Sequence, residues 1–311
     1  MLIVGAGPMA VEHGRAARAL GWSPTLLARS GDKARKTAEE SGLQVEFGDV
    51  QTWLEMQSPQ DHAVVAVSVD ALAPVTMALI AGGVGKILVE KPGGVGAAEL
   101  ARLDAAAEAS GAEVYIAYNR RFFASVRAAR TRLLEAGGAT SLRFDFTELA
   151  WKVATLKTPA AVKAAWLYAN STHVIDTAFF LTSEPERLRT EIAGGLSWHP
   201  VASRFSGSGR TDQGCLFSYV ADWESPGRWS VDVRSHKERL LLEPMESLQV
   251  QAAGGFSWES VPLDNLDGGL KPGILAQMRA FLDGHGGEHL MPLALQARRA
   301  AAVYDRILTT S

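Results

Sequence analysis

Short apolar runs alternate with longer stretches of helical periodicity in the first third of the chain. The apolar runs are rich in Val, Ile and Leu, and they cover residues 2–4, 25–28, 63–69, 87–89 and 114–117. The helical stretches between them cover residues 9–20, 33–41, 71–81 and 97–110. Strands that are buried on both faces and joined by helices form parallel sheets, so this pattern predicts an α/β domain.

After about residue 121 the pattern changes to partial alternation with a period of two. The alternating segments are separated by Gly, Pro and Ser, and they cover residues 141–150, 188–198, 214–223, 227–235 and 238–243. This pattern predicts an open, mostly antiparallel sheet with one covered face. Residues 166–181 and 290–308 have helical patterns, and we expect the second of these helices to pack back onto the first domain. The predicted domains are residues 1–121 and an α+β domain of residues 122–311.

Composition limits the classes of function. The chain has 311 residues and a formal net charge of −3, so it has no general attraction to nucleic-acid phosphates. The single cysteine, Cys215, cannot form an internal disulfide, and no Cys/His spacing is typical of a metal site. The first residues, MLIVGAG, lack a basic stretch, and no apolar run approaches the roughly 18 residues of a membrane span. We therefore expect a cytoplasmic protein with no metal, membrane or nucleic-acid partner.

A glycine-rich turn follows the first predicted strand and opens the first predicted helix. Its sequence is Gly5-Ala6-Gly7-Pro8-Met9-Ala10. In such a turn, Gly5 permits the tight bend, Gly7 lets the main chain approach a pyrophosphate, and Ala10 allows close helix packing. The helix N-terminus then faces the phosphates with free amide groups. We predict that Gly5, Gly7, Pro8, Met9 and Ala10 form a dinucleotide site.

The residues after the second predicted strand bear on which nucleotide binds. Proteins that bind NAD usually have Asp or Glu there, whereas this chain has Arg29 and Ser30, with Lys33 soon after. Arg29 could pair with a 2′-phosphate, which favours NADP over NAD as the cofactor. Alternatively, Arg29 and Lys33 are solvated loop charges and Asp32 caps the next helix. We also assign Ser68, in the third predicted strand, to the cofactor site.

Glu90-Lys91-Pro92-Gly93 follows the strand of residues 87–89. Ligands of parallel sheets bind beyond the carboxyl ends of the strands, so Lys91 is placed to donate a hydrogen bond to a substrate oxygen or to transfer a proton. An ordinary Glu-Lys-Pro surface turn is the alternative for an isolated motif of this kind.

Four motifs occur in the order and spacing of one family. They are GAGPMA with His13, EKPG, the run Tyr118-Asn119-Arg120-Arg121-Phe122, and the run Asn170-Ser171-Thr172-His173-Val174-Ile175-Asp176. In these motifs the chain resembles the glucose-fructose oxidoreductase, inositol dehydrogenase and rhizopine-catabolism (Gfo/Idh/MocA) family. The resemblance implies a Rossmann dinucleotide-binding domain followed by a domain with an open, mostly antiparallel sheet. It also implies hydride transfer to or from a ring carbon of a sugar, nucleotide sugar or cyclitol.

The resemblance implies roles for individual residues. Lys91 would contact the reacting oxygen, and His173 would act as acid/base or substrate ligand. Glu90, Lys91, Pro92 and Asn119 would border the cofactor, while Tyr118 and Asn119 would line the crevice. Arg121 would support the junction of the domains.

One departure from the family pattern concerns the residue four positions before His173. Family members commonly have Asp there, but this chain has Ala169, which cannot relay a proton. Asn170 could bind the substrate, although an amide cannot act as a base. Asp176 could orient the imidazole, but a structural cap or an ion pair is the favoured reading. Lys91 and His173 are then the candidate catalytic residues.

Six of the eight tryptophans fall in the second domain. Trp151 precedes the His173 helix, and we expect it to approach the substrate. Most of the others would cover a sheet or an oligomer interface, and we favour the interface. The loop expected at residues 203–213 contains Arg204 and Arg210. It would close over a ligand, hold a diphosphate, or be an ordinary mobile hairpin loop.

The leading prediction is an NADP(H)-dependent oxidoreductase of a sugar or nucleotide sugar. Two alternatives stay open: a family member that binds a dinucleotide as a sensor or subunit without catalysis, which Ala169 motivates, and an oxidoreductase of a non-sugar carbonyl or imine. We also expect a homo-oligomer, a dimer or tetramer formed through the second-domain sheet.

Overall fold

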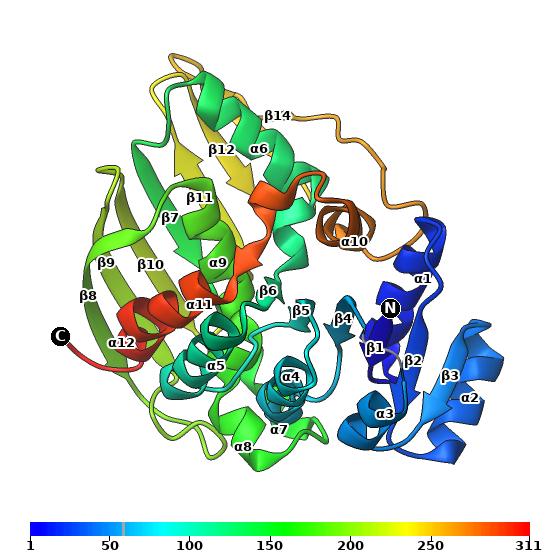
Figure 1. Cartoon of the computed structure of the whole chain (residues 1–311). Coiled ribbons are helices and arrows are strands. Elements are labelled where there is room, and N and C mark those ends of the chain that lie inside the picture. Colours follow the sequence, from blue (N-terminus) through cyan, green and yellow to red (C-terminus); the bar gives the residue numbers. More distant parts are fainter. Residues whose placement is uncertain (58–59) are drawn as a thin grey trace. The chain divides into compact units, whose positions relative to one another are not determined.

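The computed structural model describes residues 1–57 and 60–311 and divides them into two compact units (Figure 1). The first unit comprises Met1–Asn119 and Leu266–Arg298, and the second comprises Arg120–Asn265 and Arg299–Ser311. The expected division had a single boundary at residue 121. The structure differs because residues 266–298 return to the first unit.

The first unit is a Rossmann domain, which confirms the predicted fold class. Its sheet has the strand order β15-β6-β5-β4-β1-β2-β3, with only β15 antiparallel to its neighbour among the described residues. The strands are β1 Leu2–Val4, β2 Thr25–Ala28, β3 Gln44–Phe47, β4 His62–Val65, β5 Lys86–Glu90, β6 Glu113–Ala117 and β15 Met291–Pro292. The helices are α1 Pro8–Ala19, α2 Gly31–Ser41, α3 Val50–Met56, α4 Leu72–Ala81, α5 Ala97–Ser110, α10 Ile274–Asp283 and α11 Leu293–Arg299, which ends at the boundary of the unit.

Local sequence explains where these elements begin and end. Pro8 stands in the first turn of α1, where its missing N–H costs no hydrogen bond. Ser30 caps α2 by accepting a hydrogen bond from the amide of Lys33, and Gly42 ends this helix with φ +66°. The strand expected at 63–69 is shorter, because residues 69–71 already turn into a 3₁₀ helix before α4. Strand β3 was not predicted, because Gln44 and Glu46 make it too polar to resemble a buried strand.

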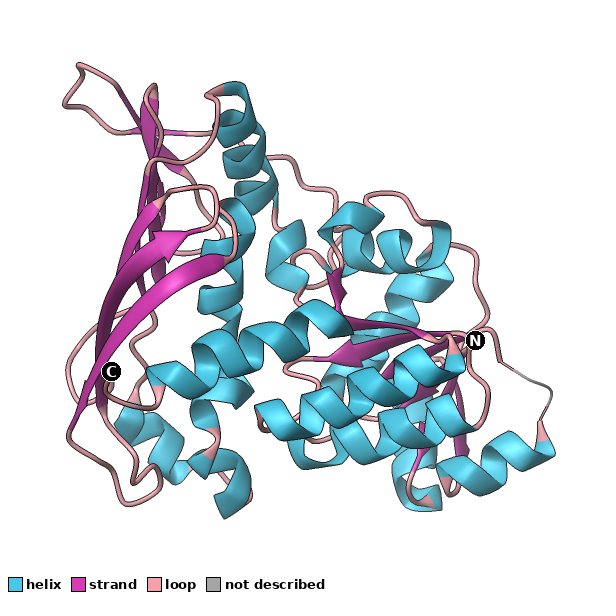
Figure 2. Ribbon diagram, turned by 60° about the vertical axis from the view of Figure 1, so that its left-hand side comes forward, coloured by secondary structure: helices cyan, strands magenta, loops and turns pink. Residues whose placement is uncertain are grey.

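The second unit contains an open sheet with helices on one face. Its strand order is β14-β13-β12-β11-β7-β10-β9-β8, and β10 pairs in parallel with β7. The helices α6, α9 and α12 pack against this sheet, and Figure 2 shows them on one side of it. The strands are β7 Ser141–Asp145, β8 Pro185–Ala193, β9 Arg204–Thr211, β10 Leu216–Asp222, β11 Ser230–Arg234, β12 Glu238–Leu242, β13 Gln249–Ala252 and β14 Glu259–Ser260. The helices are α6 Ala124–Glu135, α7 Ala150–Thr155, α8 Ala160–Ala164, α9 Thr172–Leu181 and α12 Asp305–Ile307.

The loop expected at residues 203–213 is wrong, because Arg204–Thr211 form strand β9 between β8 and β10. Its Gly and Ser content suggested a loop, but the glycines make room for aromatic rings. A Cβ at Gly207 would lie 2.5 Å from the Tyr219 ring, and one at Gly209 would lie 2.6 Å from Phe217. Arg210 pairs with Glu186 at 2.6 Å. The segment is therefore part of the sheet and does not close over a ligand.

Two further expectations need correction. The helix expected at 290–308 is confirmed over residues 293–307, where α11, a π-helical turn at Ala300–Tyr304 and α12 follow one another without a break, but it begins later because Met291–Pro292 form β15. Its residues up to Arg298 belong to the first unit and the remainder to the second. The expected interface position is wrong for Trp223, which is 1% exposed and stacks on Trp198 with ring centroids 5.9 Å apart. No helix in the described part of the chain is long and apolar enough to cross a membrane.

Candidate functional site

The glycine-rich turn after β1 brings the main chain to the carboxyl edge of the Rossmann sheet. Gly5 has φ +135°, and a Cβ there would overlap the carbonyl oxygen of Ala66. Gly7 is the N-cap of α1, and a Cβ there would meet no protein atom within 4 Å. The first glycine is therefore required by the fold, whereas the space at the second is open to a ligand.

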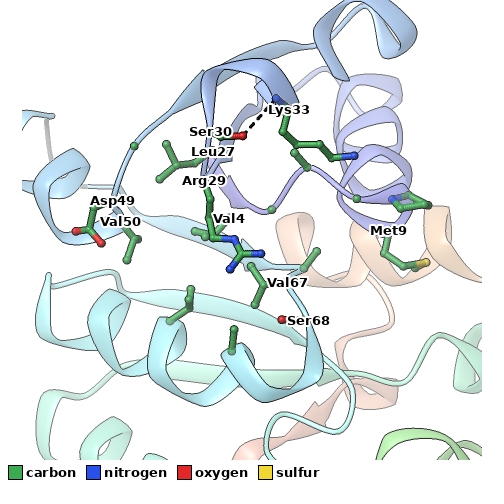
Figure 3. Close-up of a pocket in the computed structure, with 18 residues that line it drawn as sticks. Val4, Met9, Leu27, Arg29, Ser30, Lys33, Asp49, Val50, Val67 and Ser68 are labelled. Carbon is green, nitrogen blue, oxygen red and sulfur yellow. Dashed lines mark hydrogen bonds between the residues drawn. The ribbon is translucent and has the colours of Figure 1, made fainter. Parts of the chain in front are cut away.

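A cavity of about 870 Å³ lies in front of this turn (Figure 3). Eight of the predicted cofactor residues line it: Gly5, Gly7, Pro8, Met9, Arg29, Ser30, Lys33 and Ser68. Ala10 does not line the cavity; it is fully buried and packs near Gly5. The sequence analysis missed Asp49 and Val50 because they follow the unrecognised strand β3.

The polar side chains of this cavity carry more positive than negative charge. Arg29 and Lys33 come from the end of β2 and the first turn of α2, and Figure 3 shows Arg29 pointing toward Val67 and Ser68. Asp49 contributes a carboxylate, but its Oδ1 already accepts hydrogen bonds from two amides at the start of α3, at 2.9 and 3.2 Å. Because β2 ends in Ala28 followed by Arg29, no acidic residue occupies the position that usually binds the ribose hydroxyls.

The Glu90-Lys91-Pro92 segment follows β5 and is held by contacts within the first unit. Glu90 Oε1 lies 2.8 Å from His13 Nε2, and the Lys91–Pro92 peptide bond is cis. Gln296 Nε2 donates hydrogen bonds to the Pro92 carbonyl oxygen at 3.0 Å and to the Tyr118 hydroxyl at 2.9 Å. These contacts fix the turn that carries Lys91, a half-buried residue.

Several predicted residues of the first unit lie outside the 870 Å³ cavity. Glu90, Lys91 and Pro92 do not line it. Tyr118 is 1% exposed, with its hydroxyl bound by Gln296. Asn119 Nδ2 donates to the Pro272 carbonyl oxygen at 3.0 Å, so its amide holds the returning segment.

The second unit places His173 in the first turn of α9. Its side chain is 7% exposed, and its ring centroid is 6.2 Å from that of Trp229. Asp176 faces elsewhere: it accepts hydrogen bonds from Arg121 at 2.8 and 2.6 Å and also pairs with Arg299. Asp176 is therefore an ion-pair residue, and Arg121 belongs to the same buried cluster.

Glu148 is a site residue that the sequence analysis missed. It follows β7, is 6% exposed, and accepts hydrogen bonds from Asn170 Nδ2 at 3.0 and 2.9 Å. Ser171 Oγ donates a third hydrogen bond at 2.9 Å. The amide of Asn170, predicted to bind substrate, is thus engaged with Glu148. A lone Glu after a strand carries no recognisable signal in the sequence.

A cavity of about 470 Å³ lies beside this cluster in the second unit. Its lining residues come from distant segments: Arg120, Thr147, Glu148, Leu149, Gly227, Arg228, Trp229, Met245 and Glu246. Trp151, predicted to approach the substrate, is 72% exposed on α7 and does not line this cavity. Trp229 is the tryptophan that lines it.

Across the residues described, no group of three or more His, Cys, Asp or Glu could hold a metal ion.

Comparison with known proteins agrees with this architecture. Residues 1–118 match the family described as "Oxidoreductase family, NAD-binding Rossmann fold". Solved structures share the fold over nearly the whole chain. Levoglucosan dehydrogenase in complex with NADH and levoglucosan is 18% identical, with a TM-score of 0.77, and the match covers 99% of this chain and 95% of that one.

Two further solved structures give similar values. UDP-N-acetylglucosamine 3-dehydrogenase from Acidithiobacillus ferrooxidans is 15% identical, with a TM-score of 0.75 and coverage of 99% and 97%. An NAD binding oxidoreductase from Klebsiella pneumoniae is 15% identical, with a TM-score of 0.79 and coverage of 99% and 96%. No curated protein sequence matches the chain.

The matched first domain is that of an oxidoreductase which binds a nicotinamide dinucleotide. Residues 1–118 match the model of the Gfo/Idh/MocA family, which confirms the resemblance for the motifs in this part of the chain.

Proposed function

We propose that the protein is an NADP(H)-preferring dehydrogenase that moves a hydride to or from a ring carbon of a sugar or nucleotide sugar. The observation that carries this proposal is the 870 Å³ cavity at the glycine turn, which combines an open helix N-terminus with Arg29, Ser30 and Lys33. The solved structures that share the fold include dehydrogenases of levoglucosan and of a UDP-sugar, which supports the substrate class.

The hydrogen-bond donors that line the cavity are suited to the phosphates of a dinucleotide. The pyrophosphate would face the free amides at the start of α1, beside Gly7. A 2′-phosphate would face Arg29, Ser30 and Lys33 at the start of α2, where a helix N-terminus also favours an anion. The nicotinamide, when bound, accepts or supplies the hydride.

The side chains that would handle the proton are Lys91 and His173. Lys91 would donate a hydrogen bond to the reacting oxygen and stabilise the negative charge that develops on it. His173, a buried imidazole beside Trp229, would bind the substrate or exchange a proton with it. Ala169 cannot assist His173, so proton transfer depends on these two groups.

Two measurements test the proposal. Fluorescence titration of the full chain should give a lower dissociation constant for NADPH than for NADH, and the reverse order would reject the NADP preference. Absorbance at 340 nm should change when the protein and NADP are mixed with a sugar or nucleotide sugar from a panel. Dinucleotide binding without turnover of any member would favour the alternative that Ala169 suggests, a protein that binds the dinucleotide without catalysis.

Turnover of a cyclic ketone or imine that lacks sugar hydroxyls would instead favour a non-sugar substrate. Purification of the protein with a sugar nucleotide bound would contradict that alternative. Native mass spectrometry measures this retention and also tests the predicted dimer or tetramer.

A further inference from the structure

Arg120 carries a guanidinium group whose charge is not neutralised by a contact within its unit. Its Nε is buried and has no hydrogen-bond partner among the residues that the structure describes. Glu148 and Glu246 act on it through charge alone, without a hydrogen bond. A buried cation normally requires an anionic or hydrogen-bonding partner, because the loss of hydration is otherwise uncompensated.

Two aromatic rings hold this guanidinium at the 470 Å³ cavity. Its central carbon lies 4.9 Å from the ring centroid of Trp229 and 5.6 Å from that of Phe123. The rings attract the positive charge but offer no acceptor for its N–H groups. Burial lowers the pKa of Arg120 to about 10, so the group stays protonated at neutral pH. The cavity therefore presents a partly desolvated positive charge at neutral pH.

The other charged residues of the cavity do not satisfy this need. Glu148 already accepts three hydrogen bonds, two from Asn170 Nδ2 and one from Ser171 Oγ. Glu246 is exposed, so water screens its attraction to Arg120. Arg228, which is also exposed, adds a second positive charge to the lining.

We propose that Arg120 binds the carboxylate of a sugar acid in this cavity. The proposal rests on the proposed function and narrows its substrate class from sugars in general to acidic sugars. A guanidinium binds a carboxylate through charged hydrogen bonds, which would offset the cost of removing its charge from water. A volume of about 470 Å³ is within the usual range for small ligands.

The charges of the cavity favour a carboxylate over a phosphate. A phosphate monoester carries nearly two negative charges at neutral pH, and both would face Glu148 and Glu246. A carboxylate carries one charge and matches Arg120, the one half-buried guanidinium of the lining, because Arg228 is exposed to water. The preferred ligand is therefore a monoanionic sugar.

The test measures binding to the full chain saturated with NADPH, using the change in tryptophan fluorescence and, independently, calorimetry. The ligands are glucuronate and galacturonate, the neutral sugars glucose and galactose, and glucose 6-phosphate. We expect at least one uronate to bind 10- to 100-fold more tightly than its neutral counterpart, the range for one charged hydrogen-bonding contact, and more tightly than the sugar phosphate.

Substitutions at Arg120 show whether this preference depends on the cavity. Arg120→Met should remove the preference for the uronate, and Arg120→Lys should keep part of it by retaining the charge. Arg187→Met, at an exposed position on β8, is the matched control and should keep the full preference. Thermal unfolding of each variant identifies any that fail to fold, and Arg120→Lys then carries the comparison.

Any of four results would overturn the proposal. They are equal affinity for uronates and neutral sugars, binding of neither uronate, tighter binding of the sugar phosphate, and an unchanged preference for uronates in the folded Arg120 variants. None of these results depends on turnover. Oxidation of neutral sugars with no preference for uronates would overturn this inference and leave the proposed function intact. Tight uronate binding without turnover of any sugar would support the carboxylate site at Arg120 and contradict the proposed dehydrogenase activity.

Discussion

The two cavities are built from different parts of the polypeptide. The first depends on main-chain geometry, because its turn needs glycine at position 5 and leaves free amides at the start of α1. The second depends on charged side chains, with Arg120 and Glu148 contributed by separate segments. A cavity made by the main chain should be sensitive to an added Cβ, whereas one made by side chains should be sensitive to a lost charge.

The largest effect is expected at Lys91, which lines neither cavity. Lys91→Met should lower turnover by about 10³-fold, since the reacting oxygen would lose its hydrogen-bond donor. The dissociation constant for NADPH should stay nearly unchanged, because the glycine turn and Arg29 are intact. Stopped-flow absorbance at 340 nm and fluorescence titration measure the two quantities. Retained turnover would remove Lys91 from the chemistry; Lys36→Met, at an exposed position on α2, is the control.

The next effect tests the paired charges of the second unit. Asp176 has no exposed side-chain surface and binds both Arg121 and Arg299, so Asp176→Asn leaves buried guanidinium groups without their shared carboxylate. We expect the free energy of unfolding to fall by about 3–5 kcal/mol. Urea denaturation measures this change. Asp32→Asn, which removes an ion pair between exposed residues on α2, should leave stability unchanged. Equal effects of the two substitutions would contradict the assigned role of the buried cluster.

The two glycines of the turn separate folding from binding. Gly5→Ala should destabilise the protein by at least about 2 kcal/mol, because its φ is positive and its Cβ would overlap Ala66. Gly7→Ala should leave the unfolding midpoint within error, since no protein atom lies near its Cβ, but weaken NADPH binding. Thermal unfolding and fluorescence titration check the pair. Normal NADPH affinity in Gly7→Ala would show that the pyrophosphate does not approach this turn.

The smallest effect is expected for a single side chain of the first cavity. Arg29→Ala should weaken NADPH binding by about tenfold, the loss of one charged contact with a 2′-phosphate, and leave NADH binding unchanged. Arg35→Ala, on the exposed face of α2 outside the cavity, is the control. A parallel loss of both affinities would mean that Arg29 contacts a part shared by the two nucleotides.

The sequence predicts the 870 Å³ cavity of the first unit better than the 470 Å³ cavity of the second, because the first is formed by main-chain geometry and the second by side chains. The glycine turn is a local pattern of a few consecutive residues, so its position after a strand suffices to identify it. The second cavity requires tertiary contacts between positions such as Arg120, Glu148 and Trp229, which no local pattern connects. Strand β9 was not predicted because its glycines make room for aromatic rings on β10, which the local sequence does not show. Trp151 was predicted as the aromatic site residue because it lies near His173 in the sequence, but Trp229 lines the cavity.

The return of residues 266–298 to the first unit has a consequence for biosynthesis. Helix α1 packs on α10, and strand β6 pairs with the edge strand β15 through Met291 and Ile116. When only residues 1–121 have emerged from the ribosome, β6 therefore lacks its neighbouring strand and α1 lacks the helix that covers it. An unpaired strand edge and an exposed helix face promote aggregation. The domain made first is completed last, so a stalled or truncated chain would need chaperone protection until nearly the whole protein has been translated.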